Sequence, residues 1–307
     1  MKRFFITIDT EGDNLWDWRE GMDIHTENAR FLPRFQTLCE EYGLKPTYLS
    51  NFEMISDSFF RDFAGNKQAQ GLCEIGMHLH AWNSPPVGDP LPAGKDPGAA
   101  YLIEYPENQM EEKIAFLTER IELCFGQKPI SHRAGRWATN ETYFRLLDKY
   151  GYRADCSVTP GMDWSGHSGR TQGSKGSDYR GAPHSPYRIP GTSVQEYPVS
   201  VYFDHRFYLP DPPTPKNMAR ALIHAKRFGK QQRPAEFHLA RVLRNLAERN
   251  AGAILVEIYH DLLCADGHRL LDVVENILHT DFDVVAAQRV EGRRQQAVRR
   301  GNEVIAG

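Results

Sequence analysis

The chain contains 307 residues, of which 40% are hydrophobic and 25% are charged, and its formal net charge is -3 with histidine neutral. This composition is typical of a globular protein, and without a basic excess it gives no reason to expect a nucleic-acid partner. The length suits one large domain, so we expect a single core.

Cysteine usage and the N-terminal residues indicate the compartment. The five cysteines are scattered singly and their number is odd, which is typical of a reducing environment. A short apolar run follows Lys2 and Arg3, but Asp9 interrupts it before the hydrophobic core of a signal peptide would be complete. No other segment is long and apolar enough to be a transmembrane segment. We therefore expect a cytoplasmic protein.

Apolar runs of strand length alternate with helix-like segments along the chain, which predicts an α/β domain with a largely parallel sheet. The predicted strands are residues 4–8, 46–49, 73–79, 131–133, 154–158, 194–199, 253–259 and 282–286. A helix is predicted over residues 28–42, with Gly43 as its C-terminal stop. Its apolar residues recur at helical spacing and should face the core: Phe31, Phe35 and Leu38.

A second helix is predicted over residues 106–125, with Gly126 as its stop. Its apolar residues form a broad stripe, which we expect to pack in the core and not to contact a cofactor. The stripe consists of Met110, Ile114, Leu117, Ile121 and Leu123.

Two irregular regions interrupt the alternation. Residues 83–99 are rich in proline and glycine, so the chain must turn sharply there. Residues 159–189 are rich in glycine, serine and aromatic or basic residues and are too long for a routine connection. We interpret them as a substrate loop, because Trp164, Tyr179 and Tyr187 could stack on a ligand.

Two predicted strands end in side chains that can bind a metal. Asp9 and Glu11 follow the apolar run 4–8, and residues two apart on a strand project from the same face. His78 and His80 have the same spacing at another strand end. Buried acids need a partner, often a metal or an arginine, and two histidines with one carboxylate make a divalent-metal site. The alternative for the two acids is a helix cap or a solvated loop.

Three further ionisable residues stand where a strand gives way to a loop. Arg133 follows a predicted strand, Asp163 and its neighbour Trp164 open the long loop, and His260 follows the run 253–259. Arg133 could orient Asp9, and Asp163 could either position the site or begin a turn. Polar chemistry is therefore predicted at four separate strand ends.

In the order of these motifs the chain resembles the polysaccharide deacetylases of the NodB-homology type, also called family 4 carbohydrate esterases. Residues 6–11 match the first motif of that family, in which one acid is the base and another binds the metal. By resemblance Asp9 is the base and Glu11 the metal ligand. The second, arginine and terminal histidine motifs are matched by residues 74–80, 133–137 and 258–260.

Two departures distinguish this chain from most members of that family. Thr10 stands where most members have a second acid, so Glu11 follows one residue later, and Asp13 is a competing ligand. Most members space the two histidines four residues apart, but Trp82 occupies that position here. The chain resembles instead a divergent branch with a His-x-His motif, formed by His78 and His80.

The resemblance implies a deformed (β/α) barrel of about seven parallel strands with its site at the C-terminal strand ends. It implies a single catalytic domain over residues 1–287 that includes the loop 159–189, followed by a basic C-terminal tail over residues 288–307. It also implies an enzyme that removes an acetyl group from an N-acetylated sugar, such as a polysaccharide precursor or a surface-glycan intermediate.

Within this mechanism the metal ligands are Glu11, His78 and His80. Asp9 would accept a proton from water while paired with Arg133, and His260 would protonate the leaving amine. Side chains expected to bind the substrate are Trp82, Arg136, Trp137, Asp163 and Trp164.

Zinc is the default ion for such ligands, although cobalt, nickel and manganese also suit them. Two alternatives stay open from the sequence: a metal-free hydrolase of small cyclic amides with the same fold, and a carbohydrate-binding protein that has lost catalysis. The sequence makes no prediction about oligomeric state.

Overall fold

The computed structural model describes residues 3–15, 23–86, 100–169 and 171–200, together with the backbone of two strands, residues 253–258 and 283–284. The prediction for His260 and the predicted tail over residues 288–307 lie outside the described residues.

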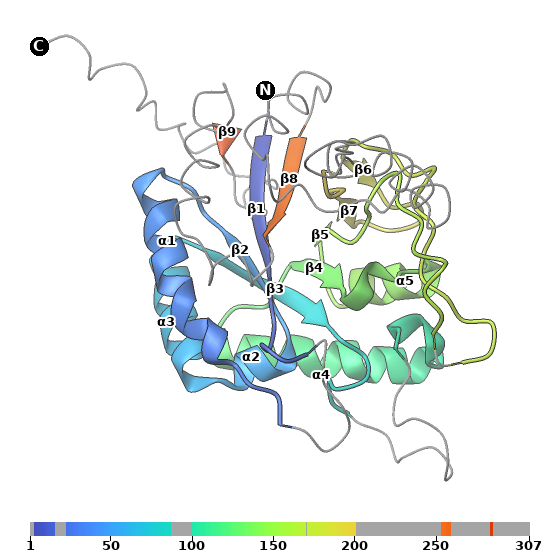
Figure 1. Cartoon of the computed structure of the whole chain (residues 1–307), viewed down its shortest axis with the longest axis horizontal. Helices are drawn as coiled ribbons and strands as arrows, with labels where there is room; N and C mark the ends of the chain where they lie inside the picture. Colours follow the sequence, from blue (N-terminus) through green and yellow to red (C-terminus); the bar gives the residue numbers. More distant parts are fainter. Residues whose placement is uncertain are drawn as a thin grey trace, which may run out of the picture.

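A nine-stranded sheet forms the centre of the fold, with the strand order β6-β7-β5-β4-β3-β2-β1-β8 and β9 paired with β1 (Figure 1). Every pairing is parallel except that of β6 with β7, so the path from β7 to β8 holds seven parallel strands. This confirms the predicted, largely parallel sheet of about seven strands. The strands are β1 (Arg3–Thr10), β2 (Thr47–Ser50), β3 (Glu74–Leu79), β4 (Ser131–Ala134), β5 (Ala154–Asp155), β6 (Tyr187–Arg188), β7 (Gln195–Glu196), β8 (Ala253–Ile258) and β9 (Asp283–Val284).

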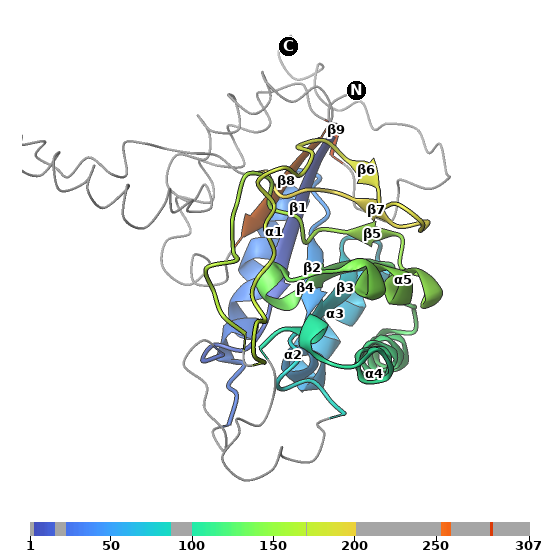
Figure 2. The same cartoon turned by 90° about the vertical axis from the view of Figure 1, so that its right-hand side faces the viewer.

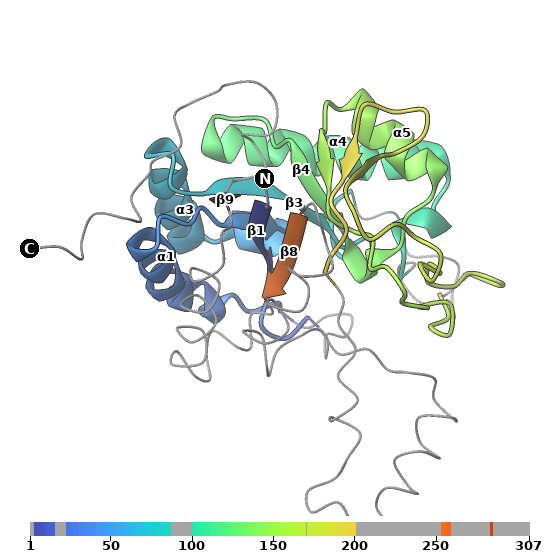
Figure 3. The same cartoon turned by 90° about the horizontal axis from the view of Figure 1, so that it is seen from above.

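Helices lie around the outside of the curved sheet, as the view from above shows (Figure 3). The α-helices are α1 (Leu32–Glu41), α2 (Phe52–Ser56), α3 (Ser58–Ala69), α4 (Glu107–Phe125) and α5 (Glu141–Lys149). Among the described residues, three short 3-10 helices accompany them: η1 (Glu27–Phe31), η2 (Leu102–Glu104) and η3 (Gly135–Trp137).

Side-chain caps fix where several helices begin. Asn51, Asp57 and Asn140 each accept a hydrogen bond from a main-chain N–H in the first turn of α2, α3 and α5. The predicted stop of α4 is confirmed, because Gly126 has a φ of 68°, a conformation that favours glycine.

The register of the parallel strands brings the polar strand ends to one edge of the sheet. In β1, Asp9 pairs with Leu49 of β2, and in β3, His78 pairs with Arg133 of β4. On the other side of β1, Ile8 pairs with Ile258, the last residue of β8. Since all these strands run in the same direction, their C-terminal ends meet at the same edge.

Most of the predicted apolar faces are in the core, with two exceptions. Phe35, Leu38, Met110, Ile114, Leu117 and Ile121 are all buried. Phe31 is 46% exposed and Leu123 is 74% exposed, so the expectation that they face the core is wrong. Phe31 lies in η1, whose tighter turn breaks the helical spacing assumed for residues 28–42, and Leu123 lies outside the i, i+3, i+4 row that contains Met110 to Ile121.

The short strands at the far end of the sheet differ most from the prediction. β5 and β7 are two residues each, shorter than the predicted runs 154–158 and 194–199. The antiparallel β6 lies inside the segment predicted as a loop. Figure 2 shows these strands continuing the sheet beyond β4.

The predictions about the cysteines and about transmembrane segments can be compared with the described residues. The described cysteines, at positions 39, 73, 124 and 156, are all free thiols. Within the described ranges, every helix is too short or too polar to traverse a bilayer. The cytoplasmic location stays a prediction.

Candidate active site

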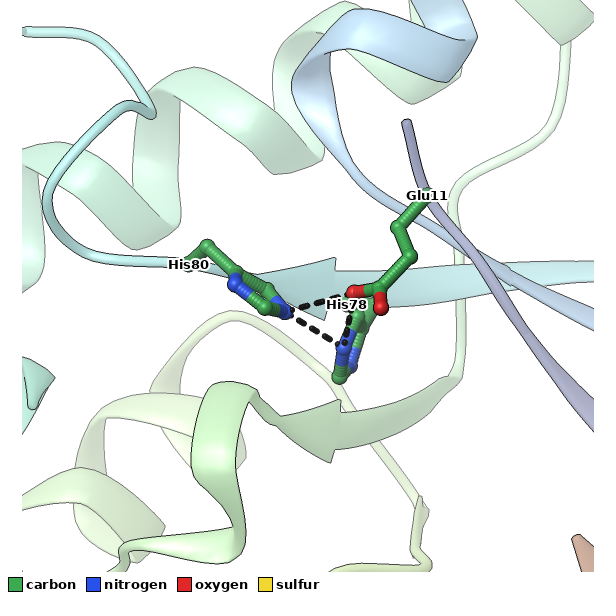
Figure 4. Close-up of side chains that lie close together, drawn as sticks. All are labelled: Glu11, His78 and His80. Carbon is green, nitrogen blue, oxygen red and sulfur yellow. Dashed lines mark hydrogen bonds and ion pairs between the residues drawn. The ribbon is translucent and has the colours of Figure 1, made fainter. Parts of the chain in front are cut away.

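Glu11, His78 and His80 form a compact buried group at the ends of β1 and β3 (Figure 4). Oε2 of Glu11 lies 2.9 Å from Nε2 of His80 and 3.3 Å from Nε2 of His78, and the two Nε2 atoms are 2.7 Å apart. Figure 4 shows Glu11 reaching from the chain after β1 toward both imidazoles. Three potential ligand atoms thus point at one place.

The hydrogen bonds around this group show that its donor atoms fit a cation. Nδ1 of His78 lies 3.0 Å from the main-chain carbonyl of Arg133 and must donate to it, because a carbonyl oxygen only accepts. In neutral His78 the lone pair is therefore on Nε2, the atom that faces Glu11. Oε2 of Glu11 is buried without a hydrogen bond of good geometry from any described residue. The group has more acceptors than protons, and a metal ion would satisfy them.

The spacing of the three atoms is close to that required by a small divalent ion. Zinc binds imidazole nitrogen and carboxylate oxygen at 2.0–2.2 Å, so neighbouring ligands of a tetrahedral ion stand roughly 3.3–3.6 Å apart. The distance from His78 to Glu11, 3.3 Å, fits this value. The other two pairs, His80 to Glu11 at 2.9 Å and the two Nε2 atoms at 2.7 Å, have to separate by several tenths of an ångström. The donor set of two imidazoles and one carboxylate is that of many catalytic zinc sites.

The electrostatics of the group favour positive charge at this point. Burial by itself would raise the pKa of Glu11, but the neighbouring His80 and His78 lower it well below its ordinary value. Burial lowers the pKa of His80, and burial of His78 is outweighed by Asp9 and Glu11, which raise its pKa. Because Arg133 already pairs with Asp9, a proton or a metal ion is needed to balance the carboxylate of Glu11.

Asp9 and Arg133 form a buried ion pair beside the three candidate ligands. Nη1 of Arg133 donates to Oδ1 of Asp9 at 2.6 Å, while Oδ2 of Asp9 lies 3.9 Å from Nε2 of His78. Nη2 of Arg133 donates to the hydroxyl of Thr7 at 2.6 Å, and its Nε donates to the carbonyl of Cys156 at 2.8 Å. The guanidinium is thus fixed on three sides. The pairing of Asp9 with Arg133 expected from the sequence is present.

We call Asp9, Glu11, His78, His80 and Arg133 the strand-end cluster.

A second buried network holds β4 in place behind the strand-end cluster. Asp155 accepts hydrogen bonds from His132 at 2.5 Å and from the hydroxyl of Ser157 at 2.9 Å, and His132 also contacts the hydroxyl of Tyr143 at 2.8 Å. Burial and the charge of Asp155 raise the pKa of the adjacent Glu196, which favours its neutral form.

Glu53 and Asn83 lie near the cluster and were missed by the sequence reasoning. Nδ2 of Asn83 donates to Oε1 of Glu53 at 2.6 Å, and the other carboxylate oxygen of Glu53 is buried without a described hydrogen-bond partner. Burial, with a smaller contribution from the charge of Glu11, raises the pKa of Glu53 to about 7. The signal that could have found Glu53 is its position three residues after the end of β2, where another parallel strand opens onto the same edge.

Aromatic side chains border the cluster on the side of His80. The ring centroids of Trp82 and His80 are 4.5 Å apart, with an angle of 67° between the ring planes. The guanidinium carbon of Arg136 lies 5.9 Å from the Trp82 ring and 5.4 Å from the Tyr101 ring. The sequence predicts Trp82 and Arg136 near the site, and the structure places Trp82 against the candidate ligand His80 and Arg136 over the Trp82 ring.

Trp137 and Trp164 extend this border. Their rings are stacked 4.8 Å apart with 14° between the planes. Nε1 of Trp164 donates to the hydroxyl of Thr159, which fixes the ring at the start of the long loop. Together with Arg136, these aromatic residues form what we call the aromatic wall, which consists of Trp82, Tyr101, Arg136, Trp137 and Trp164.

Other side chains of the long loop do not join the wall. Asp163 begins a surface turn: its Oδ1 accepts from the N–H of Ser165 at 2.9 Å, and its Oδ2 pairs with Arg180 at 3.3 Å. This geometry favours the turn, the other role that the sequence leaves open for Asp163, over substrate binding. Tyr179 is buried with its hydroxyl against Thr139, so it is placed to support the loop and not to stack on a ligand.

The competing ligand Asp13 is also excluded from the cluster. Its two carboxylate oxygens accept from the main-chain N–H groups of Glu27 and Asn28 at 2.9 and 3.0 Å, and its side chain is exposed. It anchors η1 and leaves Glu11 as the carboxylate beside the histidines. His260 lies outside the described residues, two positions beyond the end of β8.

No family model and no curated protein matches this sequence. Solved structures do match its fold. A protein described as a polysaccharide deacetylase from Mycobacterium smegmatis aligns with a TM-score of 0.57 and 16% sequence identity, over 94% of this chain and 88% of that one. The chain has the polysaccharide deacetylase fold. This confirms the fold implied by the sequence resemblance, a deformed (β/α) barrel.

Two other structures support the same fold. A protein described as a polysaccharide deacetylase from Pseudomonas aeruginosa PAO1 aligns with a TM-score of 0.51 and 10% identity. PuuE allantoinase aligns with a TM-score of 0.54 and 11% identity. Each alignment covers 94% of this chain and 88% of the other. At these identities the polysaccharide deacetylase fold is what the structures share, and the chemistry must be argued from the site itself.

Proposed function

We propose that this protein is a metal-dependent hydrolase that removes the acetyl group from an N-acetylated sugar. The observation that carries the proposal is the strand-end cluster, in which Glu11, His78 and His80 converge beside the buried pair of Asp9 and Arg133. The fold shared with proteins described as polysaccharide deacetylases supports it. The substrate follows from that association and from the aromatic wall, since aromatic rings pack against the apolar faces of sugars.

Glu11, His78 and His80 would hold the ion, with zinc as the default and cobalt, nickel or manganese as other candidates. When bound, a divalent ion supplies Lewis acidity, which polarises an amide carbonyl and makes a water molecule a better nucleophile. The protein has to provide a base for the proton of that water and an acid for the departing nitrogen.

Asp9 is the proposed base. Its Oδ1 is held by Arg133, and its Oδ2 faces Nε2 of His78 at 3.9 Å, which places it beside the candidate ligands without being one of the three. Arg133 keeps this carboxylate oriented and balances its negative charge. A water molecule between Asp9 and the ligand group can give its proton to Oδ2 while its oxygen attacks the acetyl carbon.

The leaving nitrogen then needs a proton as the C–N bond breaks, so that the products are acetate and the sugar amine. By resemblance to the deacetylases, His260 is the proposed acid. The register of β8 on β1 agrees with this role, since Ile258 pairs with Ile8, next to Asp9. One group for each proton transfer suits a reaction that removes a proton at one atom and returns it at another.

The proposal also includes the domain organisation. Residues 1–287 form the catalytic domain, the loop over 159–189 contributes Trp164 to substrate binding, and the basic tail over 288–307 lies outside it. The pairing of β8 and β9 with β1 supports this boundary, because both late strands complete the sheet that carries Asp9.

A second candidate is the hydrolysis of a small cyclic amide, which the likeness to PuuE allantoinase favours. The two candidates differ in the bond that is cleaved and in their need for a metal. The strand-end cluster favours the metal-dependent reaction.

The test combines metal analysis with acetate release. Purified protein loaded with zinc should hold about one ion per chain, and the His78→Ala, His80→Ala double variant should hold none. The loaded wild type should release acetate from at least one sugar in a panel of N-acetylated monosaccharides and oligomers. An Arg145→Gln variant, which alters an exposed ion pair with Glu107, is the matched control. Absence of zinc from loaded wild-type protein would overturn the proposal.

A further inference from the structure

Arg136 is a half-buried cation without an acidic partner among the described residues. Its guanidinium lies over two aromatic faces, with its central carbon 5.9 Å from the centroid of Trp82 and 5.4 Å from that of Tyr101, and no described carboxylate lies within ion-pair distance of it. Arg133 offers the contrast: it lies three residues earlier, is fully buried, and is neutralised by Asp9 at 2.6 Å. A guanidinium has five N–H donors, and those of Arg136 are not engaged by any described acceptor.

The backbone places Arg136 next to the strand-end cluster. A Cβ atom on Gly135 would lie 2.5 Å from the carbonyl oxygen of Leu79 and 3.0 Å from the ring of His80, so only glycine permits this close approach of β4 to the end of β3. Arg136 and Trp137 follow with φ values of 57° and 52°, in the left-handed region.

This conformation costs free energy for residues other than glycine. Two consecutive residues of this kind are unusual, and such strain persists where the surrounding structure or the function requires it. Here the strained turn directs the Arg136 side chain toward Trp82, whose ring meets that of His80 at 4.5 Å. The guanidinium is thus separated from a candidate metal ligand by one aromatic ring.

We propose that Arg136 binds a negatively charged group, a phosphate or a carboxylate, on the same substrate that presents its acetyl group to the strand-end cluster. The inference rests on the proposed function and narrows its substrate class to anionic N-acetylated sugars. The planar fork of a guanidinium matches two oxygens of either anion. Stacking against Trp82 and Tyr101 holds the fork in one orientation, which reduces the entropy lost on binding.

Phosphate and carboxylate come from different sources, and the experiment separates them. The phosphate arms use N-acetylglucosamine 1-phosphate and 6-phosphate, and the carboxylate arm uses N-acetylglucosaminuronic acid. Neutral N-acetylglucosamine is the reference. For zinc-loaded wild-type protein we expect kcat/KM for one anionic sugar to exceed that for the neutral sugar about ten- to hundredfold, the size of a charge-assisted hydrogen-bond pair.

The preference for an anionic sugar over the neutral one should depend on Arg136 alone. In Arg136→Gln the ratio of anionic to neutral kcat/KM should fall at least tenfold, mainly through KM, and Arg136→Lys should restore part of it because the charge returns without the fork. Arg145→Gln removes one positive charge from an exposed ion pair and should leave the ratio as in the wild type. An undiminished preference in Arg136→Gln, or no preference in the wild type, would overturn the inference.

A binding measurement distinguishes failure of this inference from failure of the proposed function. If no sugar releases acetate, the hydrolase proposal fails, but calorimetric titration of the zinc-loaded protein with the same sugars still tests Arg136. We expect the preferred anionic sugar to bind about tenfold or more weakly to Arg136→Gln than to wild type and Arg145→Gln. Equal affinity for all three proteins overturns the role of Arg136. Thermal unfolding of each variant verifies that it is folded.

Discussion

The strand-end cluster and the aromatic wall are adjacent but built in different ways. Three members of the cluster, Asp9, His78 and Arg133, lie within parallel strands, Glu11 and His80 each follow one closely, and all five are buried. The aromatic wall comes from segments outside the strands: Trp82 after β3, Tyr101 before η2, two residues in η3, and Trp164 in the long loop.

The difference shows how this fold separates reaction from recognition. Residues on hydrogen-bonded strands, or directly after them, have little freedom, which suits groups that must converge on one ion within tenths of an ångström. Side chains on loops can be exchanged without disturbing the sheet, which suits the choice of substrate. Changes in the cluster should therefore abolish the reaction, whereas changes in the wall should alter which sugar is bound.

The largest expected effect is on the proposed base. Asp9→Asn should lower kcat about 10²- to 10⁴-fold, because an amide cannot accept the proton of water, while zinc content stays near one ion per chain. Acetate release and metal analysis on the same preparation check both parts. Turnover at the wild-type rate would remove Asp9 from the role of base.

Removing the cation of the buried pair of Asp9 and Arg133 should lower the stability of the protein. Arg133→Met leaves Asp9 buried without its cation and should lower the free energy of unfolding by about 3–5 kcal/mol. The matched change Arg145→Met, in an exposed pair, should cost about 1 kcal/mol or less. Denaturant titrations of the three proteins provide the comparison, and similar losses in both variants would show that burial of the pair is unimportant.

Glu53 should give the protein a pH-dependent stability. Its folded pKa of about 7 is above the ordinary value of 4.5, so the folded state holds a proton that the unfolded chain has released. Stability is then lost as pH rises from about 4.5 to about 7, by at most about 3 kcal/mol. Glu53→Gln removes this loss.

The sign of this pH dependence can be tested by measuring the unfolding free energies of wild type and Glu53→Gln. The measurements are made at pH 5 and pH 8 with a chelator present. The variant should gain stability relative to wild type at the higher pH. A difference that is the same at both pH values would mean that Glu53 is already ionised in the folded protein at pH 5.

The smallest effect is expected in the wall. Trp164→Ala removes the ring stacked on Trp137 and should raise KM about fivefold with little change in kcat, since a stacked aromatic pair contributes about 1 kcal/mol. The neighbouring change Asp163→Ala alters only a surface turn and should change KM less than twofold. Steady-state kinetics on one sugar compares them, and a larger effect from Asp163 would restore it as a substrate-binding residue.

The sequence predicted the strand-end cluster better than the wall for a physical reason. The alternation of side chains along a strand is a local rule, so Glu11 and the pair His78 and His80 could be assigned to one site before any contact was known. Arg133 was assigned to Asp9 from the convergence of strand ends, and the bond is present at 2.6 Å. By contrast, Asp163 and Tyr179 were expected at the ligand because loops have no such rule.

What the amino-acid sequence determined by itself was the order of strands and helices, the parallel sheet, and the chemical types gathered at its C-terminal edge. Only the tertiary structure decided that Asp13 anchors η1 while Glu11 turns to the histidines, that Glu53 belongs beside them, and that Arg136 lies between two rings. These choices depend on contacts between residues far apart in the chain, whose free energies no local pattern encodes.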